Sequence, residues 1–376
     1  MTERIDTSNL AKNLYTHLPS TSSKEPFYMS ISLDQQDWLK SFIDLVLQQY
    51  DVELAQANAA QLPEENRGEA AVTASLARRG ATFGFPSLHP EISENQEFAS
   101  IKFLSTLKHQ AEIVLDVAVA LNRPIQGDYG HFALVMLWWA SLGELDHAEA
   151  LANAWREIST GERSIEEYAS SLEEQYVPLG DALKSHAILK DDPILALPVN
   201  QGISYFAIRF MGLLGLALHD DERLERHEIE QYYTETHSDR IHCVEATIAL
   251  AWSNGLLEAE ERNLIKKQLE ILRLNKKEKR KLLNLMITPS TPKEFAQSFS
   301  SPETAMFVLR QLVIASLIDG VQDNRERKFL HQSSKAFGLA EEQYQAIQTE
   351  MKNFIEENKS SIEQMKRHRK KRPSLL

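Results

Sequence analysis

Two segments of this chain, residues 251–262 and 316–327, are similar to each other and lie 65 residues apart. They align without a gap, and the alignment continues as far as Leu274 over Leu339. Each contains an apolar stretch, an Asn-Gly or Asp-Gly turn, an acidic residue, and then Glu-Arg three positions further on. Because an internal repeat is one structural unit used twice, this pattern predicts a helical domain built from two similar halves.

The rest of the chain also predicts helices. Apolar residues recur at spacings of three and four, and the alternation typical of strands is scarce. We therefore expect an all-α protein, with a multi-helix N-terminal domain followed by the bundle of two similar halves. The predicted divisions are a flexible arm at 1–30, a helical domain at 31–198, an apolar helix and His-rich connector at 199–239, the bundle at 240–357 and a basic tail at 358–376.

Several motifs predict where helices begin or end. Capping boxes, and Pro at the first helical position, mark helix starts, and Gly marks a helix end. These signals stand at Ser32 to Gln35, Ser164 to Glu167, Thr291-Pro292, Ser301-Pro302 and Gly338. The polar stretch 63–95 contains several Pro and Gly residues, and it predicts a long connection with at most one short helix, near 70–78. The first repeat helix is expected to begin near His242.

Composition limits the class of protein. The formal net charge is −13, so nucleic-acid phosphates would be repelled, and we expect no nucleic-acid partner. Cys243 is the only cysteine, which excludes an intramolecular disulfide and is typical of a reducing cytoplasm. It lies in an apolar run and is expected to be a buried core residue. Residues 1–6 contain no apolar stretch typical of a signal peptide, so we do not expect one, and the apolar runs 132–142 and 211–218 are shorter than the roughly 20 residues of a spanning helix. We therefore expect a cytoplasmic protein.

The acidic residues of the two repeat turns form a candidate cation site: Asp319, Asp323 and Glu326 in the second turn, with Glu258 and Glu261 in the first. Asp319 follows an apolar helix, and a carboxylate at a helix C-terminus is unfavourable unless a cation compensates it. A divalent cation (calcium, magnesium or manganese) would do so, with ligands from both turns. The alternative is that these residues cap helices, since each turn resembles a capping box. Capping explains every acidic residue except Asp319.

Four histidines lie within 24 residues, among several carboxylates: His219, His227, His237 and His242. A transition-metal site is one interpretation. The other, which we favour, is a solvated and charged connector, because the segment contains no His-Glu-x-x-His motif. The chain also contains no Walker A loop, no GxGxxG and no GxSxG motif. We therefore expect that the protein is not an enzyme.

Six of the seven residues from Lys366 to Arg372 are Lys or Arg. We expect a solvated end that keeps the acidic chain soluble. The alternative is contact with an anionic membrane surface, where each basic residue adds about 1 kcal/mol of binding free energy. Nucleic-acid contact is less favoured, because no aromatic residues are interleaved with the Lys and Arg residues of the tail. Membrane attachment through this tail would be weak and sensitive to salt.

The repeated unit consists of a helix, Asp-Gly, two residues, an acid, two residues, Glu and a second helix. This pattern resembles the TerB-like domain over residues 240–355. That domain occurs in the tellurite-resistance protein TerB and in the N-terminal region of DjlA-type co-chaperones. The resemblance implies an all-helical bundle of two halves, associated with tellurite and stress responses, divalent-cation binding and membrane-linked complexes. The family's acidic positions fall on Asp319, Asp323 and Glu326, and on Glu258 and Glu261, while Asn254 stands where Asp is usual.

These observations lead to one expected function and two alternatives. We expect a non-enzymatic cytoplasmic stress-response protein, whose TerB-like domain is a cation-sensing or protein-docking module and whose N-terminal helical domain binds a protein partner. The first alternative is a structural adaptor subunit of a defence or chaperone complex, without a metal. The second is an enzyme whose site lies in the N-terminal half of the chain.

Overall fold

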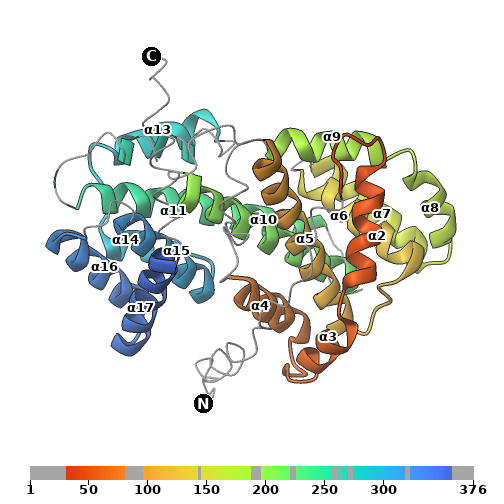
Figure 1. Ribbon diagram of the computed structural model, residues 1–376, viewed down its shortest axis with the longest axis horizontal. Coiled ribbons are helices and arrows are strands. Elements are labelled where there is room, and N and C mark those ends of the chain that lie inside the picture. Colours follow the sequence, from red (N-terminus) through yellow and green to blue (C-terminus); the bar gives the residue numbers. More distant parts are fainter. Residues whose placement is uncertain are drawn as a thin grey trace. The chain divides into compact units, whose positions relative to one another are not determined.

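The computed structural model describes residues 31–80, 96–142, 145–187, 196–220, 226–253, 255, 261–262, 265–266, 268–269, 274–317 and 322–357. Within these ranges it contains fifteen helices and no strand (Figure 1). The expected all-α fold is therefore confirmed. None of the helices in these ranges has the length and apolar character that crossing a membrane requires. The predicted arm at 1–30 and the basic tail lie outside the described residues.

The described residues fall into two compact units. Unit 1 contains those within 1–86, 96–188 and 207–232, and unit 2 contains those within 189–206 and 233–376. Helices α10 (Ala196–His219) and α11 (Arg226–Ala251) contribute residues to both units. The boundary between the units therefore falls inside helices rather than in a loop.

Unit 1 is built around helix α6. The helices α2 to α9 belong to this unit: α2 (Trp38–Gln49), α3 (Val52–Ala59), α4 (Arg67–Gly80), α5 (Gln96–Ala120), α6 (Gly127–Ser141), α7 (Leu145–Ser159), α8 (Ile165–Leu172) and α9 (Tyr176–Ala187). Nine of the fifteen residues of α6 are buried, so this helix is covered on most of its circumference. It packs against α2, α7, α8 and α9, whereas α5 packs against α2, α3 and α4. Aromatic rings fill the centre, with Phe42 6.3 Å from Trp138 and Trp38 5.6 Å from Phe103 between ring centroids.

Unit 2 contains two adjoining groups of helices. Its helices besides α11 are α13 (Lys276–Leu285), α14 (Pro292–Ala296), α15 (Pro302–Leu317), α16 (Asn324–Ala336) and α17 (Glu341–Glu357). In the first group, Ile248 of α11 and Leu282 of α13 pack with Ile265 in one apolar cluster. In the second, α15 packs against α16 and α17, and α14 packs against α16. The ring of Phe307 on α15 stacks on Tyr205 of α10, with centroids 3.8 Å apart.

Most of the predicted helix ends are confirmed. Ser164 and Thr291 begin α8 and α14 with capping boxes. The hydroxyl of Ser301 accepts a hydrogen bond from the backbone N–H of Thr304, at the start of α15. Gly338 has a φ of +73° directly after α16, and glycine adopts that left-handed conformation without steric cost. The one helix expected near 70–78 is α4.

Two predicted helix starts are wrong. The motif at Ser32 does not begin a helix: residues 33–37 form turns, and α2 begins at Trp38. A cap contributes only about 1 kcal/mol, and here the buried side chains that begin at Trp38 set the helix start. The first repeat helix begins at Arg226 rather than near His242, so most of the predicted connector is helical. Its buried side chains Tyr232, Thr236 and Asp239 follow helical spacing, but two of the three are polar, so hydropathy does not reveal the face.

Candidate functional site

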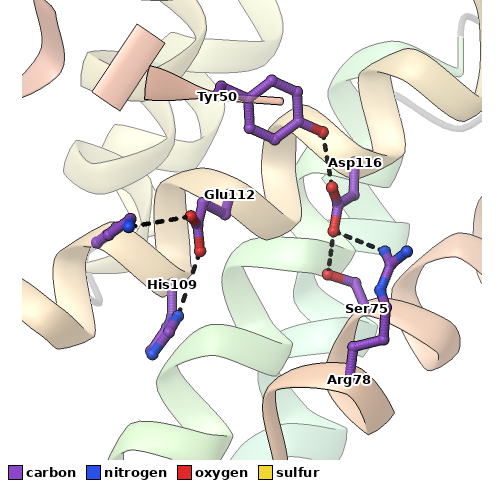
Figure 2. Close-up of polar contacts among 7 residues, drawn as sticks. Tyr50, Ser75, Arg78, His109, Glu112 and Asp116 are labelled. Atoms are coloured by element: carbon purple, nitrogen blue, oxygen red, sulfur yellow. Dashed lines mark hydrogen bonds and ion pairs between the residues drawn. The ribbon is translucent and has the colours of Figure 1, made fainter. Parts of the chain in front are cut away.

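A buried carboxylate with several hydrogen-bond donors is Asp116, on α5 in unit 1. Its side chain is 8% exposed. As Figure 2 shows, it accepts hydrogen bonds from the hydroxyl of Tyr50 at 2.6 Å, the hydroxyl of Ser75 at 2.5 Å and the guanidinium of Arg78 at 2.9 Å. These donors come from the end of α2 and from α4. The network therefore joins three helices, and its three donors occupy the carboxylate.

A second carboxylate, Glu112, lies one helical turn before Asp116 on the same face of α5 (Figure 2). Its oxygens lie 3.3 Å from Nδ1 of His109 and 3.6 Å from Nζ of Lys108. These are local contacts within one helix, of the kind that add a few tenths of a kcal/mol each. The sequence pattern did not predict this network. A single Asp inside the apolar run around Asp116 could have indicated a buried, hydrogen-bonded carboxylate.

His131 of unit 1 connects a carboxylate to a phenol. Its Nε2 lies 2.7 Å from Asp44, and its Nδ1 is hydrogen-bonded to the hydroxyl of Tyr176. Burial, with contributions from nearby carboxylates including Asp44, raises the pKa of Tyr176 above its ordinary value. A raised pKa keeps the phenol protonated at neutral pH, so it is not available as a phenolate nucleophile. The chain Asp44–His131–Tyr176 therefore holds α2, α6 and α9 together.

In the second repeat turn, Asp323 and Glu326 form a reciprocal capping box. Oδ1 of Asp323 accepts from the backbone N–H groups of Arg325 at 2.6 Å and Glu326 at 2.8 Å. Oε2 of Glu326 accepts from the backbone N–H of Asp323 at 2.9 Å. The capping interpretation is confirmed for these two residues, because each uses one oxygen to satisfy the exposed start of α16.

Gly255 of the first repeat turn and Arg325 of the second lie close together in unit 2. A Cβ atom placed on Gly255 of the first turn would lie 3.9 Å from Nη1 of Arg325 in the second. Gly255 has a φ of +84°, which accounts for glycine at this turn position. Turns separated by 65 residues in the sequence thus contribute to one surface, and the side chain that faces Gly255 is a cation.

The other three candidate ligands of the predicted cation site are Glu261, Asp319 and Glu258. Glu261 is half-buried, and Asp319 and Glu258 lie outside the described residues. In the part of the chain that the structure describes, no three His, Cys, Asp or Glu side chains are grouped so as to hold a metal. Because two of the five candidates are not described, a divalent cation at the turns stays a prediction.

The histidines of the predicted connector have separate partners. His219 is 1% exposed, and its Nδ1 lies 2.9 Å from the hydroxyl of Tyr129. His237 lies 3.2 Å from Glu278, and His242 is described below. The side chain of His227 lies outside the described residues. The described histidines of this group are therefore packed against different neighbours and do not converge.

Glu245 is the centre of a polar cluster between α11 and the segment after α13. His242 lies 3.1 Å from it, Ser290 donates a hydrogen bond to it, and Nζ of Lys281 lies 3.8 Å away. Burial alone would raise the pKa of Glu245, but the hydrogen bonds from His242 and Ser290 and the charge of Lys281 outweigh burial and lower it. The ionised form of Glu245 therefore stabilises unit 2.

A buried carboxylate on the same helix holds the start of α15. Asp239 is fully buried, and it accepts hydrogen bonds from the backbone N–H of Ser300 at 2.9 Å and from the Ser300 hydroxyl at 2.5 Å. Cys243 lies one turn further along α11, and it is buried as expected. Desolvation, followed by the charge of Asp239, raises the pKa of Cys243 to about 12. Its thiol is thus protonated at neutral pH and unreactive.

Comparison with known proteins assigns part of the chain. Residues 217–351 match the model of a family described as "Protein of unknown function (DUF533)". This part of the chain is a DUF533 domain. The domain begins before α11 and extends into α17, so it contains both repeat turns. No curated protein and no solved structure matches the chain. The TerB-like assignment therefore has no named homologue behind it, and it stays a prediction.

Removing the buried carboxylate of unit 1 should destabilise the protein strongly. Asp116→Ala leaves Arg78, Ser75 and Tyr50 without their shared acceptor, and breaking a buried ion pair in this way costs about 3–5 kcal/mol. The free energy of unfolding, measured by urea denaturation, should fall by that amount. Asp181→Ala is the control, because Asp181 is 72% exposed and pairs with Lys184 at 3.7 Å. Its loss should cost less than about 1 kcal/mol. Equal losses in the two variants would contradict the structural role of Asp116.

Replacing Glu245 should remove stability in a pH-dependent way. The folded-state pKa of Glu245 is lowered, so its contribution is complete above the ordinary Glu pKa and is lost as pH falls through the folded value. The difference in unfolding free energy between wild type and Glu245→Gln should be largest near neutral pH and shrink below about pH 4. Glu342→Gln, at an exposed position of α17, is the control and should follow the wild type. A constant difference at every pH would show that ionisation of Glu245 does not matter.

Proposed function

We propose that the chain is a non-enzymatic, cytoplasmic stress-response protein of the TerB-like type, in which the paired turns of the DUF533 domain form a docking surface for a protein partner. The observation that carries this proposal is the approach of Gly255 to the guanidinium of Arg325. It brings the repeated motif, which is the most specific feature of the sequence, together on one surface. A motif that is duplicated and then brought together is expected to act as a unit.

The rigidity of the second turn supports a docking role. The capping box of Asp323 and Glu326 holds the backbone, and the guanidinium of Arg327 donates to the carbonyl of Gln322 at 3.2 Å. Asn324, Arg325 and Arg327 are exposed beyond this support. A surface that is already ordered loses little conformational freedom on binding, so more of its contact energy appears as affinity. Exposed guanidinium groups in this setting suit carboxylates of a partner.

Two buried groups that could act as nucleophiles, Cys243 and Tyr176, have raised pKa values. A nucleophile in an active site needs a lowered pKa or an activating base. The pKa of Cys243 is raised to about 12 by burial and Asp239, and that of Tyr176 is also raised by burial. The buried carboxylates Asp116 and Asp239 each accept at least two hydrogen bonds from neighbouring helices or loops.

A cross-linking experiment tests the docking surface. A photo-reactive amino acid at Asn324, beside the paired turns, should give a discrete adduct with one partner in cells. The same residue at Lys352, exposed on α17, is the positional control and should not give that adduct. Adding Arg327→Glu should abolish the adduct at position 324, because it reverses the charge of the surface. Identical adduct patterns at 324 and 352, or a pattern unchanged by the charge reversal, would contradict the proposal.

Cation sensing is the second candidate, and one detail of the cap favours it. Both capping hydrogen bonds fall on Oδ1 of Asp323, so capping leaves Oδ2 for another ligand. Asp319 and Glu258 belong to the same pair of turns in the sequence. Carboxylate oxygens from two turns are suitable ligands for calcium, magnesium or manganese. If the protein senses a cation, the bound ion would hold the two turns of the docking surface together.

The cation candidate predicts a rise in melting temperature. Binding to the folded state stabilises it by RT ln(1 + [L]/Kd), about 2.7 kcal/mol when the ion is at 100 times Kd. Millimolar calcium, magnesium or manganese should therefore raise the melting temperature, and Asp319→Asn should remove the rise while leaving the protein folded. Asp37→Asn is the control, because Asp37 begins α2 without a side-chain capping bond. A melting temperature unchanged by all three ions would exclude the cation and leave the docking proposal in place.

A further inference from the structure

Helix α13 carries a dense positive charge on an acidic protein. Lys276, Lys277, Lys279, Arg280 and Lys281 are all exposed. The one acidic residue among them, Glu278, is half-buried, caps the helix start with Asn275 and contacts His237. No carboxylate of the described residues pairs with Lys276, Lys277, Lys279 or Arg280, although Lys281 approaches Glu245. The whole chain has a net charge of −13, so this helix is a local reversal of sign.

The same helix exposes large aliphatic side chains. Leu283 is 53% exposed, and Ile287, just beyond the helix end, is 80% exposed. The opposite face packs against α11 through Leu282, which is fully buried, and through the partly buried Leu285 and Met286. Figure 1 shows α13 running along α11. The inner face of α13 therefore has a partner in unit 2, and its outer face is apolar as well as basic.

Helical spacing places the aliphatic and basic side chains on one outer surface. Arg280 and Leu283 are three residues apart on α13, so they form a stripe on one face of the helix, and the exposed Ile287 follows just beyond the helix end. Lys279 lies on one side of this stripe, and Lys277 lies on the other. The outer surface thus has Lys276, Arg280 and Leu283 along its centre, with Lys277 and Lys279 on its two flanks.

We propose that the outer face of α13 binds an anionic membrane surface, with Leu283 and Ile287 inserted at the boundary between lipid headgroups and acyl chains. Long basic side chains can reach the headgroups while the aliphatic side chains of Leu283 and Ile287 enter the apolar layer. An acidic protein would also attract the charges. It gives no reason for two aliphatic side chains to protrude beside the basic residues, whereas a membrane offers charge above an apolar layer. This contact is separate from the docking surface at the paired turns.

Vesicle co-sedimentation of the full-length protein tests this proposal. The wild type should bind phosphatidylcholine vesicles that contain phosphatidylserine and should not bind vesicles of phosphatidylcholine alone. Each basic residue near an anionic surface adds about fivefold to binding. The variant Lys277→Gln/Lys279→Gln/Arg280→Gln should therefore lose on the order of 100-fold in affinity at low salt. The variant Leu283→Ser/Ile287→Ser should also bind more weakly, and its remaining binding should be released at lower salt than that of the wild type.

A matched control separates α13 from general surface charge. The variant Lys293→Gln/Lys328→Gln/Lys352→Gln removes three exposed bases from the same unit, and it should bind nearly as the wild type does. All these proteins retain the basic tail at 366–372. If the α13 variants and the control lose equal affinity, or if none loses affinity, the membrane contact does not lie on α13 and the proposal is overturned.

A fluorescent label reports insertion directly. Cys243 is buried, so a cysteine introduced as Ile287→Cys can be labelled selectively with an environment-sensitive dye. Its emission should shift to the blue and increase when vesicles with phosphatidylserine are added. The control is Leu54→Cys, at a position of unit 1 that is 56% exposed, and its emission should not change. Emission at 287 that responds to polyglutamate but not to vesicles would overturn the proposal and identify an acidic polypeptide as the partner.

Discussion

Every α-helix leaves backbone N–H groups without partners at its start, and this constraint organises the chain, because it is built from many short helices. At several helix starts a capping box, in which two residues exchange hydrogen bonds, satisfies these N–H groups. Ser164 with Glu167, Asn275 with Glu278, and Asp323 with Glu326 each exchange side-chain and backbone hydrogen bonds, and Glu294 accepts from the backbone N–H of Thr291. The carboxylates at these positions are thereby engaged in holding helix starts. The acidic turn of the repeat is one case of this general solution, which is why its ligand capacity is limited to oxygens that capping does not use.

Buried carboxylates join the helices that capping begins. Asp116 connects α5 to α4 and to the end of α2, while Asp239 connects α11 to the start of α15. A buried carboxylate is costly unless donors surround it, and each of these has two or three. Such contacts require one arrangement of the helices, because a shifted helix would leave the charge without its donors. These two carboxylates therefore contribute to the specific packing of the helices that they join.

Charge is distributed so that different surfaces can have different roles. The paired turns present exposed guanidinium groups beside a rigid helix start, and α13 presents lysines around exposed aliphatic side chains. Both surfaces belong to unit 2, and both contrast with the negative net charge of the chain. Like charges elsewhere on the protein would repel acidic partners or anionic lipids, so under the two proposals these positive regions are where such partners would make contact. A docking protein that is also recruited to a membrane is consistent with this arrangement.

The sequence alone determined the helical class, the repeat and most of the helix ends, because each depends on interactions within a few residues. Capping at Ser164 and Thr291, and the turn at Gly338, are local in this sense. Capping by Asp323 and Glu326 was one of two interpretations that the sequence allowed, and hydrogen bonds confirm it. The sequence also contained the lysine run of α13, but it gave no sign that Leu282 points inward while Leu283 is exposed.

Only the tertiary structure decided which polar groups meet. The donors to Asp116 lie 38 to 66 residues from it in the chain, and no local motif connects them. The length of α11 was hidden for a similar reason: Thr236 and Asp239 are buried but polar, so their side chains do not mark an apolar face. The approach of Gly255 to Arg325 depends on how α11, α15 and α16 pack. Spacing along the chain determines local backbone structure, whereas contacts between distant residues depend on packing that no short segment specifies.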